Sequence, residues 1–311
     1  MSNVNENVFN FNELSIDKEN SAVSYNDELH KYWTKGSNQS CISVTTLIHK
    51  FSTFDEAFWA SYKALESLAS EEQFKEIKPT LLNTKVFNER YLDMVGISDS
   101  DFNERRQEIL NEWAEKRDAS CIRGTAIHRQ HELEHLAGKT KELSHLGLGG
   151  KFSTNTTNNL ELGTQKVYPE LLLSIISPDN KLRLAGQADL VIVDGNDVYI
   201  LDYKTNKKIE TKSFFDRKTK KSQMMKYPLN NLQDTNFWHY SLQLSTYAWM
   251  IQKANPEFNI KSLILIHYDH DDNCTTYECE YLKQDVERML GYYKNQIEHE
   301  EFKKSREKIN F

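Results

Sequence analysis

Three short apolar segments separated by turn residues constrain the fold of this chain more than any other feature. Residues 166–176, 182–193 and 198–204 are rich in Val, Ile, Leu and Tyr. Ser-Pro-Asp-Asn at 177–180 and Asp-Gly-Asn-Asp at 194–197 separate them, and such sequences favour tight turns. The pattern predicts three strands joined by two hairpins.

The flanking segments place these strands in an α/β fold. Apolar residues at helical spacing predict helices between 55 and 137, over 236–254 and from Lys283 onward. Further strands are predicted within 22–43, over 262–268 and near 275–281. This order is typical of a central mixed β-sheet flanked by helices. We therefore expect an N-terminal region of strands and helices over residues 1–118 and a core with a C-terminal helix over residues 119–311.

Composition excludes several classes of protein. With 311 residues, 38% hydrophobic and 27% charged, the chain can bury a core. No apolar stretch approaches the ~18 residues of a membrane span, and the N-terminus lacks a secretory signal pattern. Four cysteines are too few for a disulfide framework. We expect a soluble cytoplasmic protein with no membrane partner and no iron–sulfur cluster.

The third predicted strand ends in an acid and an amine. Side chains alternate along a strand, so Asp202 and Lys204 project from one face and Tyr203 from the other. The hairpin at 194–197 can bring Asp202 beside Asp189, which lies within the preceding apolar strand. Two adjacent carboxylates repel unless a divalent cation lies between them, which favours Mg²⁺ or Mn²⁺. The alternative is a structural Asp–Lys ion pair with Asp189 as a strand-end cap.

Other polar residues flank this pair. Glu170 is a third acid inside an apolar strand. The segment Gly124–His128 is expected to begin a helix. Gln243 and Tyr247 are four positions apart on the predicted helix over 236–254, and therefore share one helical face.

Five sequence elements, in this order, resemble the PD-(D/E)XK nuclease superfamily. They are G-x-x-x-H at 124–128, Glu170, G-x-x-D at 186–189, D-x-K at 202–204 and Q-x-x-x-Y at 243–247. The resemblance covers roughly residues 120–270 and is to the branch with RecB-type nucleases, lambda-type exonucleases and the mitochondrial genome maintenance exonuclease. Ala188 stands where the family name has proline. The segment from Tyr25 to Trp59 is similar to phage-encoded members.

The resemblance implies roles for the residues of these elements. Asp189 and Asp202, helped by His128 and the carbonyl of Tyr203, would hold Mg²⁺, with Mn²⁺ able to substitute. Lys204 would orient or help to deprotonate the attacking water.

Three further roles follow from the same resemblance. Glu170 would bind through water or hold a second metal, and so joins Asp189, Asp202 and Lys204 as a catalytic candidate. Gln243 and Tyr247 would line the site and contact the DNA backbone.

The activity implied is that of a Mg²⁺-dependent deoxyribonuclease, and we expect an exonuclease acting in phage or bacterial recombination, repair or replication. The partners would be single-stranded DNA or duplex ends, and a recombination or replication protein. The helical region over 44–118 would lie over the cleft and admit a DNA end. An endonuclease of the same fold and a non-catalytic DNA-binding subunit remain alternatives.

A basic segment follows the D-x-K element. Residues 203–226 hold nine lysines and arginines against two acidic residues, a net charge of +7 in a chain whose total is −7. Next to a catalytic element, such a segment favours phosphate attraction over a merely solvated loop. The DNA-guiding residues are expected to be Lys207, Lys208, Lys212, Arg217, Lys218, Lys220 and Lys221.

One competing pattern points to a different enzyme class. The segment His131–His135 has the sequence H-E-x-x-H of zinc proteases, in which two histidines one helical turn apart chelate zinc. The surrounding Arg129, Gln130, Glu132 and Glu134 indicate a solvated helix face instead. Zinc proteolysis is therefore disfavoured, and both histidines are expected to be exposed.

Overall fold

The computed structural model describes residues 15–16, 23–26, 29, 31–36, 39–216 and 220–309. The chain packs into two compact units, one formed by Met1–Thr53 with Ala126–Phe311 and the other by Phe54–Thr125. The division predicted from sequence lies after residue 118. In the structure the first strands pack with the sheet, because β4 pairs with β7.

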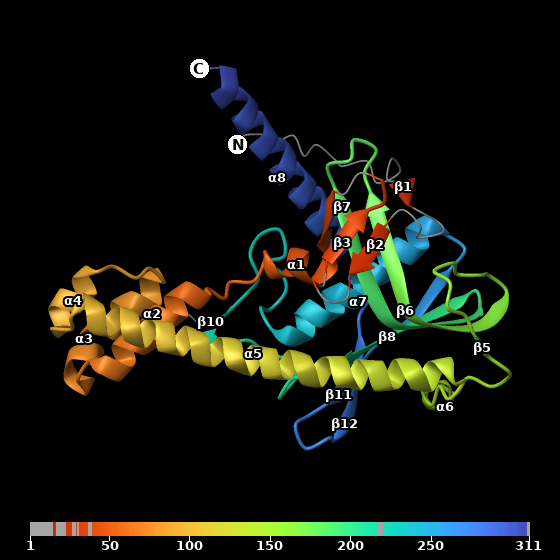
Figure 1. The fold of residues 1–311 in the computed structure, drawn as a ribbon, viewed down its shortest axis with the longest axis horizontal. Helices are drawn as coiled ribbons and strands as arrows, with labels where there is room; N and C mark the ends of the chain where they lie inside the picture. The colour runs from red at the N-terminus through yellow and green to blue at the C-terminus, as the bar shows by residue number, and fades with distance from the viewer. Residues whose placement is uncertain are drawn as a thin grey trace. The chain divides into compact units, whose positions relative to one another are not determined.

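Ten strands of the described residues form one mixed sheet in the first unit (Figure 1). Their order is β12-β11-β8-β7-β4-β3-β2, and β6 also pairs with β7 and carries β1 and β5. The pairs β8–β11, β4–β7 and β5–β6 are parallel and the others are antiparallel. The predicted fold class, a central mixed sheet flanked by helices, is confirmed.

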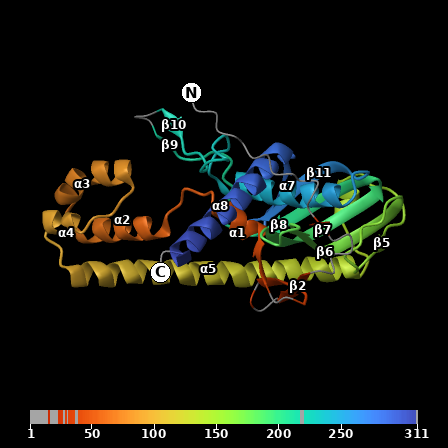
Figure 2. The same cartoon turned by 90° about the horizontal axis from the view of Figure 1, so that it is seen from above.

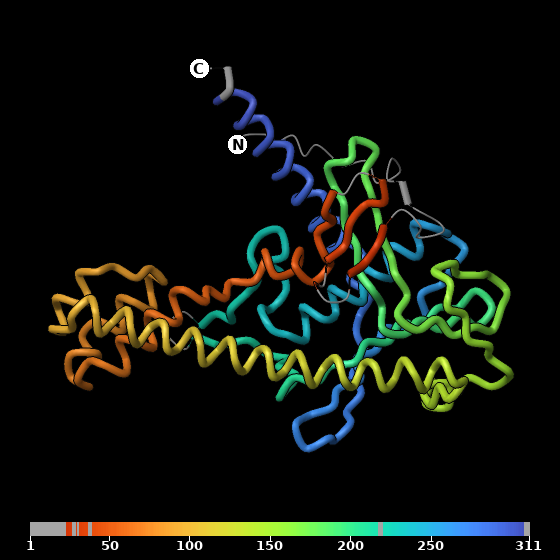
Figure 3. Tube along the Cα trace, viewed as in Figure 1, coloured from red at the N-terminus to blue at the C-terminus, as the bar shows by residue number. Residues whose placement is uncertain are grey.

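The three predicted central strands are present, and seven further strands of the described residues complete the sheet; Figure 3 traces the path of the chain through them. Their bounds are β6 Thr164–Ile176, β7 Arg183–Gly195 and β8 Asp197–Lys204. The others are β1 Ser15–Ile16, β2 Val23–Asn26, β3 Lys31–Thr34, β4 Ser40–Ser43, β5 Ser153–Thr154, β11 Asn259–Tyr268 and β12 Cys274–Cys279.

Strands β7 and β8 separate near their middle. Their ladder runs from Asp194 opposite Asp197 to Leu190 opposite Leu201. Beyond this point β7 pairs with β4, through Leu184 and Ala185. Asp189 lies at the position where the two ladders divide.

Helices cover both faces of the sheet in this unit (Figure 2). On one face lie α1 (Val44–His49), α7 (Asn236–Ala254) and α8 (Lys283–Ile309), which share a core with β6, β7, β8 and β11. On the other face lie α6 (Glu142–His145) and the last turns of α5, whose His131 and His135 rings stack on Tyr203. None of the described helices is long and apolar enough to cross a membrane.

The second unit is helical. It contains α2 (Glu56–Leu68), α3 (Glu71–Thr84), α4 (Arg90–Val95) and most of α5 (Asp99–Leu136) around its own apolar core. Asp55 caps α2 and Ser70 forms a capping box on α3, so both helices begin at residues that satisfy free backbone amides. The predicted helix start at Gly124 is wrong, because α5 begins at Asp99 and passes through Gly124 without a break.

Candidate metal centre

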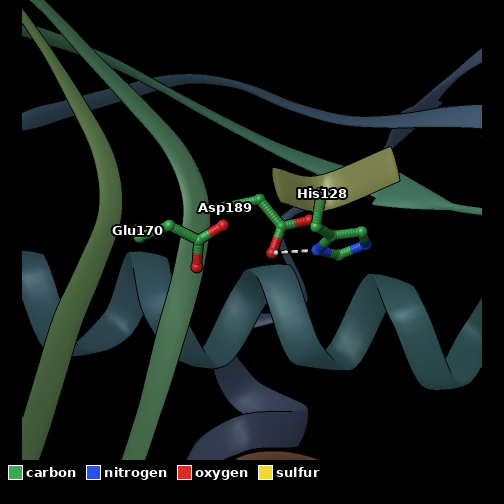
Figure 4. A group of neighbouring side chains, drawn as sticks. All are labelled: His128, Glu170 and Asp189. Atoms are coloured by element: carbon green, nitrogen blue, oxygen red, sulfur yellow. Dashed lines mark ion pairs between the residues drawn. The ribbon is translucent and has the colours of Figure 1, made fainter. Parts of the chain in front are cut away.

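Three side chains that can bind a metal converge from three elements of the sheet unit. His128 comes from α5, Glu170 from β6 and Asp189 from β7, and their side chains point toward one another (Figure 4). One ligand atom from each lies within 4.8 Å of the other two. The two carboxylates are ligands of the kind that suit Mg²⁺ or Mn²⁺, and the imidazole is a common ligand of transition metals.

Asp189 links this group to strand β8. Its Oδ2 accepts a hydrogen bond of 2.7 Å from the backbone N–H of Tyr203, and its Oδ1 lies 3.4 Å from Nδ1 of His128. The charge of Asp189 raises the pKa of His128 to about 9. Burial alone would raise the pKa of Asp189, but His128 and Lys204 hold that pKa below its ordinary value.

Glu170 has a strained backbone. Its φ is 49°, in the left-handed region that non-glycine residues adopt at a cost of about 1–3 kcal/mol. In the β6–β7 ladder Pro169 pairs with Leu190 and Leu171 pairs with Ala188. Glu170 lies between these two pairs without a ladder partner, and so lies across from Asp189. Burial, and then the charge of Asp189, raise the pKa of Glu170 to about 8. A buried acid beside a second acid is the environment in which a bound cation is favourable.

Asp202 and Lys204 lie on the face of β8 that α7 covers. Asp202 is completely buried, and its Oδ1 accepts a 3.1 Å hydrogen bond from Nε2 of Gln243. Nζ of Lys204 lies 2.5 Å from Oδ2 of Asp202 as an ion pair, but this oxygen has no partner with hydrogen-bond geometry. The nitrogen also lies 4.8 Å from the ring centroid of Tyr240.

The ion pair sets the charge state of both groups. Burial raises the pKa of Asp202 to about 6, against the opposing effect of Lys204. Burial would lower the pKa of Lys204, but the carboxylates of Asp202 and Asp189 hold it above its ordinary value. Lys204 is therefore a fixed positive charge at neutral pH.

The predicted metal ligands are only partly brought together. His128 and Asp189 are adjacent, whereas Asp202 is engaged by Lys204 and Gln243. The carbonyl oxygen of Tyr203 lies 2.9 Å from Nε2 of His128. Asp202 thus lies outside the three-residue group, and the Tyr203 carbonyl borders it at His128.

Gln243 and Tyr247 are buried and hold Asp202 in place. Nε2 of Gln243 donates to Asp202 and, at 3.2 Å, to the hydroxyl oxygen of Tyr247. A Cβ added to Gly186 would lie 2.6 Å from the Tyr247 ring, so glycine is needed there to admit this tyrosine. Contact of Gln243 and Tyr247 with DNA remains a prediction.

The expected exposure of His131 and His135 is wrong. They are 4% and 1% exposed, because this side of α5 packs onto the sheet and both rings lie against Tyr203. The spacing of His128, His131 and His135 on one helical face was the signal for this arrangement. In the part of the chain that the structure describes, the three-residue group with metal-binding geometry does not include His131 or His135, the two histidines of the H-E-x-x-H pattern.

Among the residues predicted to guide DNA, five lysines of the basic segment are described and exposed. They are Lys207, Lys208, Lys212, Lys220 and Lys221. Lys220 and Lys221 lie at the start of β10 (Lys221–Ser222), which pairs with β9 (Phe215–Asp216). Arg217 and Lys218 lie outside the described residues.

Comparison with known proteins gives one informative match. A family model described as the PD-(D/E)XK nuclease superfamily matches residues 88–309. No curated protein matches the chain significantly. A solved structure titled "Crystal structure of SSO0001" is 17% identical over 42% of this chain, with a TM-score of 0.24. The match spans half of that chain's length, and a likeness this weak carries no argument.

Proposed function

Because this chain belongs to the PD-(D/E)XK nuclease superfamily, we propose that it is a Mg²⁺-dependent deoxyribonuclease, and specifically an exonuclease of recombination, repair or replication. One observation carries the proposal. The group of His128, Glu170 and Asp189 adjoins an Asp202–Lys204 pair through the backbone of Tyr203. A cation site and a fixed positive charge beside it are two features that favour phosphodiester hydrolysis, because both stabilise negative charge in the transition state.

The site residues divide into ligands and an electrostatic group. His128, Glu170 and Asp189 would hold Mg²⁺ or Mn²⁺, with Asp202 as a further carboxylate whose Oδ2 lacks a hydrogen bond. A bound divalent ion supplies a water of lowered pKa and stabilises negative charge on the phosphate.

Lys204 has a role that its environment defines. Two carboxylates keep its ammonium charged, so it is unsuited to act as a general base at neutral pH. It orients water and stabilises the charge that develops on the scissile phosphate. Asp202 anchors the ammonium, and Gln243 anchors Asp202.

The DNA path is proposed to follow the basic segment. Lys207 and Lys208 come directly after β8, and Lys220 and Lys221 follow further along. Their exposed ammonium groups would contact phosphates on either side of the cleavage site. The helical unit is proposed to select DNA ends, and a recombination or replication protein to deliver them.

Time-resolved digestion tests this proposal. Linear and circular DNA, each single- and double-stranded and labelled at one end, would be incubated with Mg²⁺, with Mn²⁺ and with a chelator. We expect linear DNA to be degraded from its ends and circular DNA to stay intact. With the chelator present, we expect no cleavage. Cleavage of circular DNA would instead identify an endonuclease, and binding without cleavage in either metal would identify a non-catalytic subunit.

A further inference from the structure

We propose that Tyr203 is a positioning residue that holds the candidate metal ligands from the opposite face of β8. It acts with a buried network of His131, His135 and Glu142. The proposal rests on the proposed function, because it assigns these residues to the same metal site.

The backbone of Tyr203 is joined to two of the three converging side chains. Its N–H donates to Oδ2 of Asp189 at 2.7 Å, and its carbonyl oxygen lies 2.9 Å from Nε2 of His128. A shift of this one peptide unit would therefore move both ligands.

The ring of Tyr203 is fixed on the other side of the strand. It stacks on the His131 ring, with centroids 4.1 Å apart and an interplanar angle of 9°. Its hydroxyl donates to Oε1 of Glu142 at 2.9 Å and lies 3.1 Å from Nε2 of His135. The side chain is 1% exposed, so no solvent competes for these contacts.

One proton arrangement gives a partner to each donor around the Tyr203 hydroxyl. In this arrangement Thr140 Oγ1, which lies 3.2 Å from Nδ1 of His135, donates to that nitrogen. Nε2–H of His135 then donates to the Tyr203 hydroxyl, and that hydroxyl donates to Glu142. A chain of donors with a single direction fixes the ring more tightly than packing alone.

Two observations separate this network from ordinary core packing. Oε2 of Glu142 is buried without a hydrogen bond, and burial of an unsatisfied oxygen costs free energy. Two apolar side chains in place of Tyr203 and Glu142 would avoid this cost. In addition, His131 and His135 lie on the same face of the same helix as His128. The network therefore fixes both ends of the contact between His128 and the Tyr203 carbonyl.

Tyr203→Phe tests the proposal, since it removes the hydroxyl and keeps the stacked ring. The readout is the Mn²⁺ affinity of the protein without DNA, followed by electron paramagnetic resonance. We expect the affinity to fall about 10-fold, as for other groups that orient metal ligands. Glu142→Gln, a second variant of nearly the same shape, should lower it in the same direction.

The control and a double variant distinguish positioning from stability. Tyr281→Phe removes a comparable hydrogen bond, from the hydroxyl to Oε1 of Gln252 at 3.0 Å, and should leave Mn²⁺ affinity unchanged. In a His128→Ala background, Tyr203→Phe should lower the affinity by a smaller factor than in the unchanged protein, because one of the two ligands that Tyr203 positions is gone. Unchanged affinity in Tyr203→Phe, or equal losses in both backgrounds, would overturn the proposal. A protein that binds Mn²⁺ as expected but cuts no DNA would instead refute the nuclease function.

A different observation carries a second inference, which also rests on the proposed function. We infer that the ribbon formed by β9 and β10 contacts single-stranded DNA through Phe214 and Phe215. These side chains are 73% and 52% exposed. Phe215 lies opposite Ser222, and the carbonyl of Phe214 accepts a hydrogen bond from the N–H of Gln223.

The ribbon presents an aromatic ring on each of its two faces, because neighbouring side chains of a strand point in opposite directions. Exposed Lys212, Lys220 and Lys221 lie along the same segment. Aromatic rings among lysines suit unpaired bases with their phosphates, since every base has a face that can stack. A duplex keeps its bases stacked in its interior, so it has few free base faces on which these rings can stack.

The test compares binding of single-stranded and duplex oligonucleotides of one sequence, with a chelator present to prevent cleavage. The double variant Phe214→Ala, Phe215→Ala should bind the single strand at least 10-fold more weakly and the duplex within twofold of the unchanged protein. Phe302→Ala, which removes a ring 57% exposed on α8, is the matched control and should change neither. Equal losses for both DNA forms, or none, would overturn the inference. Cleavage of duplex ends is measured separately, so failure of this binding test would not by itself argue against the proposed function.

Discussion

The two faces of strand β8 both bury polar groups, but they do so in different ways. On the α7 face, Asp202 and Lys204 form an ion pair in which one carboxylate oxygen lacks a hydrogen bond. On the α5–α6 face, the hydroxyl of Tyr203 belongs to a chain of hydrogen bonds that ends at Glu142. Residues adjacent in sequence therefore take part in different interactions, an ion pair on one face and a chain of hydrogen bonds on the other, although each face buries one carboxylate oxygen without a hydrogen bond.

We propose that the difference separates a reactive face from a supporting one. The first face buries a charged pair in which burial raises the carboxyl pKa of Asp202 to about 6, and such perturbed groups are typical of functional sites. Nearly complete hydrogen bonding on the second face restricts motion of the strand that carries the charges. Variants on the first face should thus change the rate of cleavage, and those on the second should change metal affinity and stability.

Lys204→Ala gives the largest expected effect. The variant should bind DNA within threefold of the unchanged protein and cut it at least ~100-fold more slowly, because the lost charge acts mainly in the transition state. Single-turnover cleavage at saturating protein measures the rate, and a thermal melt reports on folding. Lys261→Ala on β11 is an exposed control. Near-normal cutting by Lys204→Ala would remove this residue from the mechanism and with it the assignment of the reactive face.

His135→Ala should act on stability. It leaves the Tyr203 hydroxyl and Thr140 without their shared partner, which we expect to lower the free energy of unfolding by about 2 kcal/mol. Chemical denaturation measures the change. His145→Ala, at an exposed position of α6, should stay within about 0.5 kcal/mol of the unchanged protein. Equal stability of the two variants would contradict the supporting role of the second face.

Exchange of surface lysines should give the smallest effect, since neither face of β8 is touched. Replacing Lys220 and Lys221 with Gln should flatten the dependence of log affinity for DNA on log salt by about 1.5, because each lost phosphate contact removes roughly 0.7 to 0.9. The same exchange at Lys303 and Lys304 on α8 is the matched control. If both pairs give the same slope, the basic segment is an ordinary solvated loop and the DNA path lies elsewhere.

Much of the sheet unit follows from local sequence. The helix predicted over 236–254 is α7, Asn236–Ala254, and the strand predicted to end at Lys204 is β8. Both depend on the period of apolar residues and on the turn residues that bound them, which are properties of neighbouring positions. The alternation of Asp202, Tyr203 and Lys204 between faces follows from the same period.

The surroundings of the site depended on contacts between distant parts of the chain. The charged neighbours of His131 and His135 predicted exposure, yet both rings are buried against Tyr203, about 70 positions away. Likewise, nothing local indicates that Glu170 turns into the left-handed region across from Asp189. Local periodicity determined which strands and helices form, because it sets how much apolar surface each can bury. Tertiary structure decided which polar side chains were buried with them, because a polar group is buried favourably only where partners from other elements satisfy it.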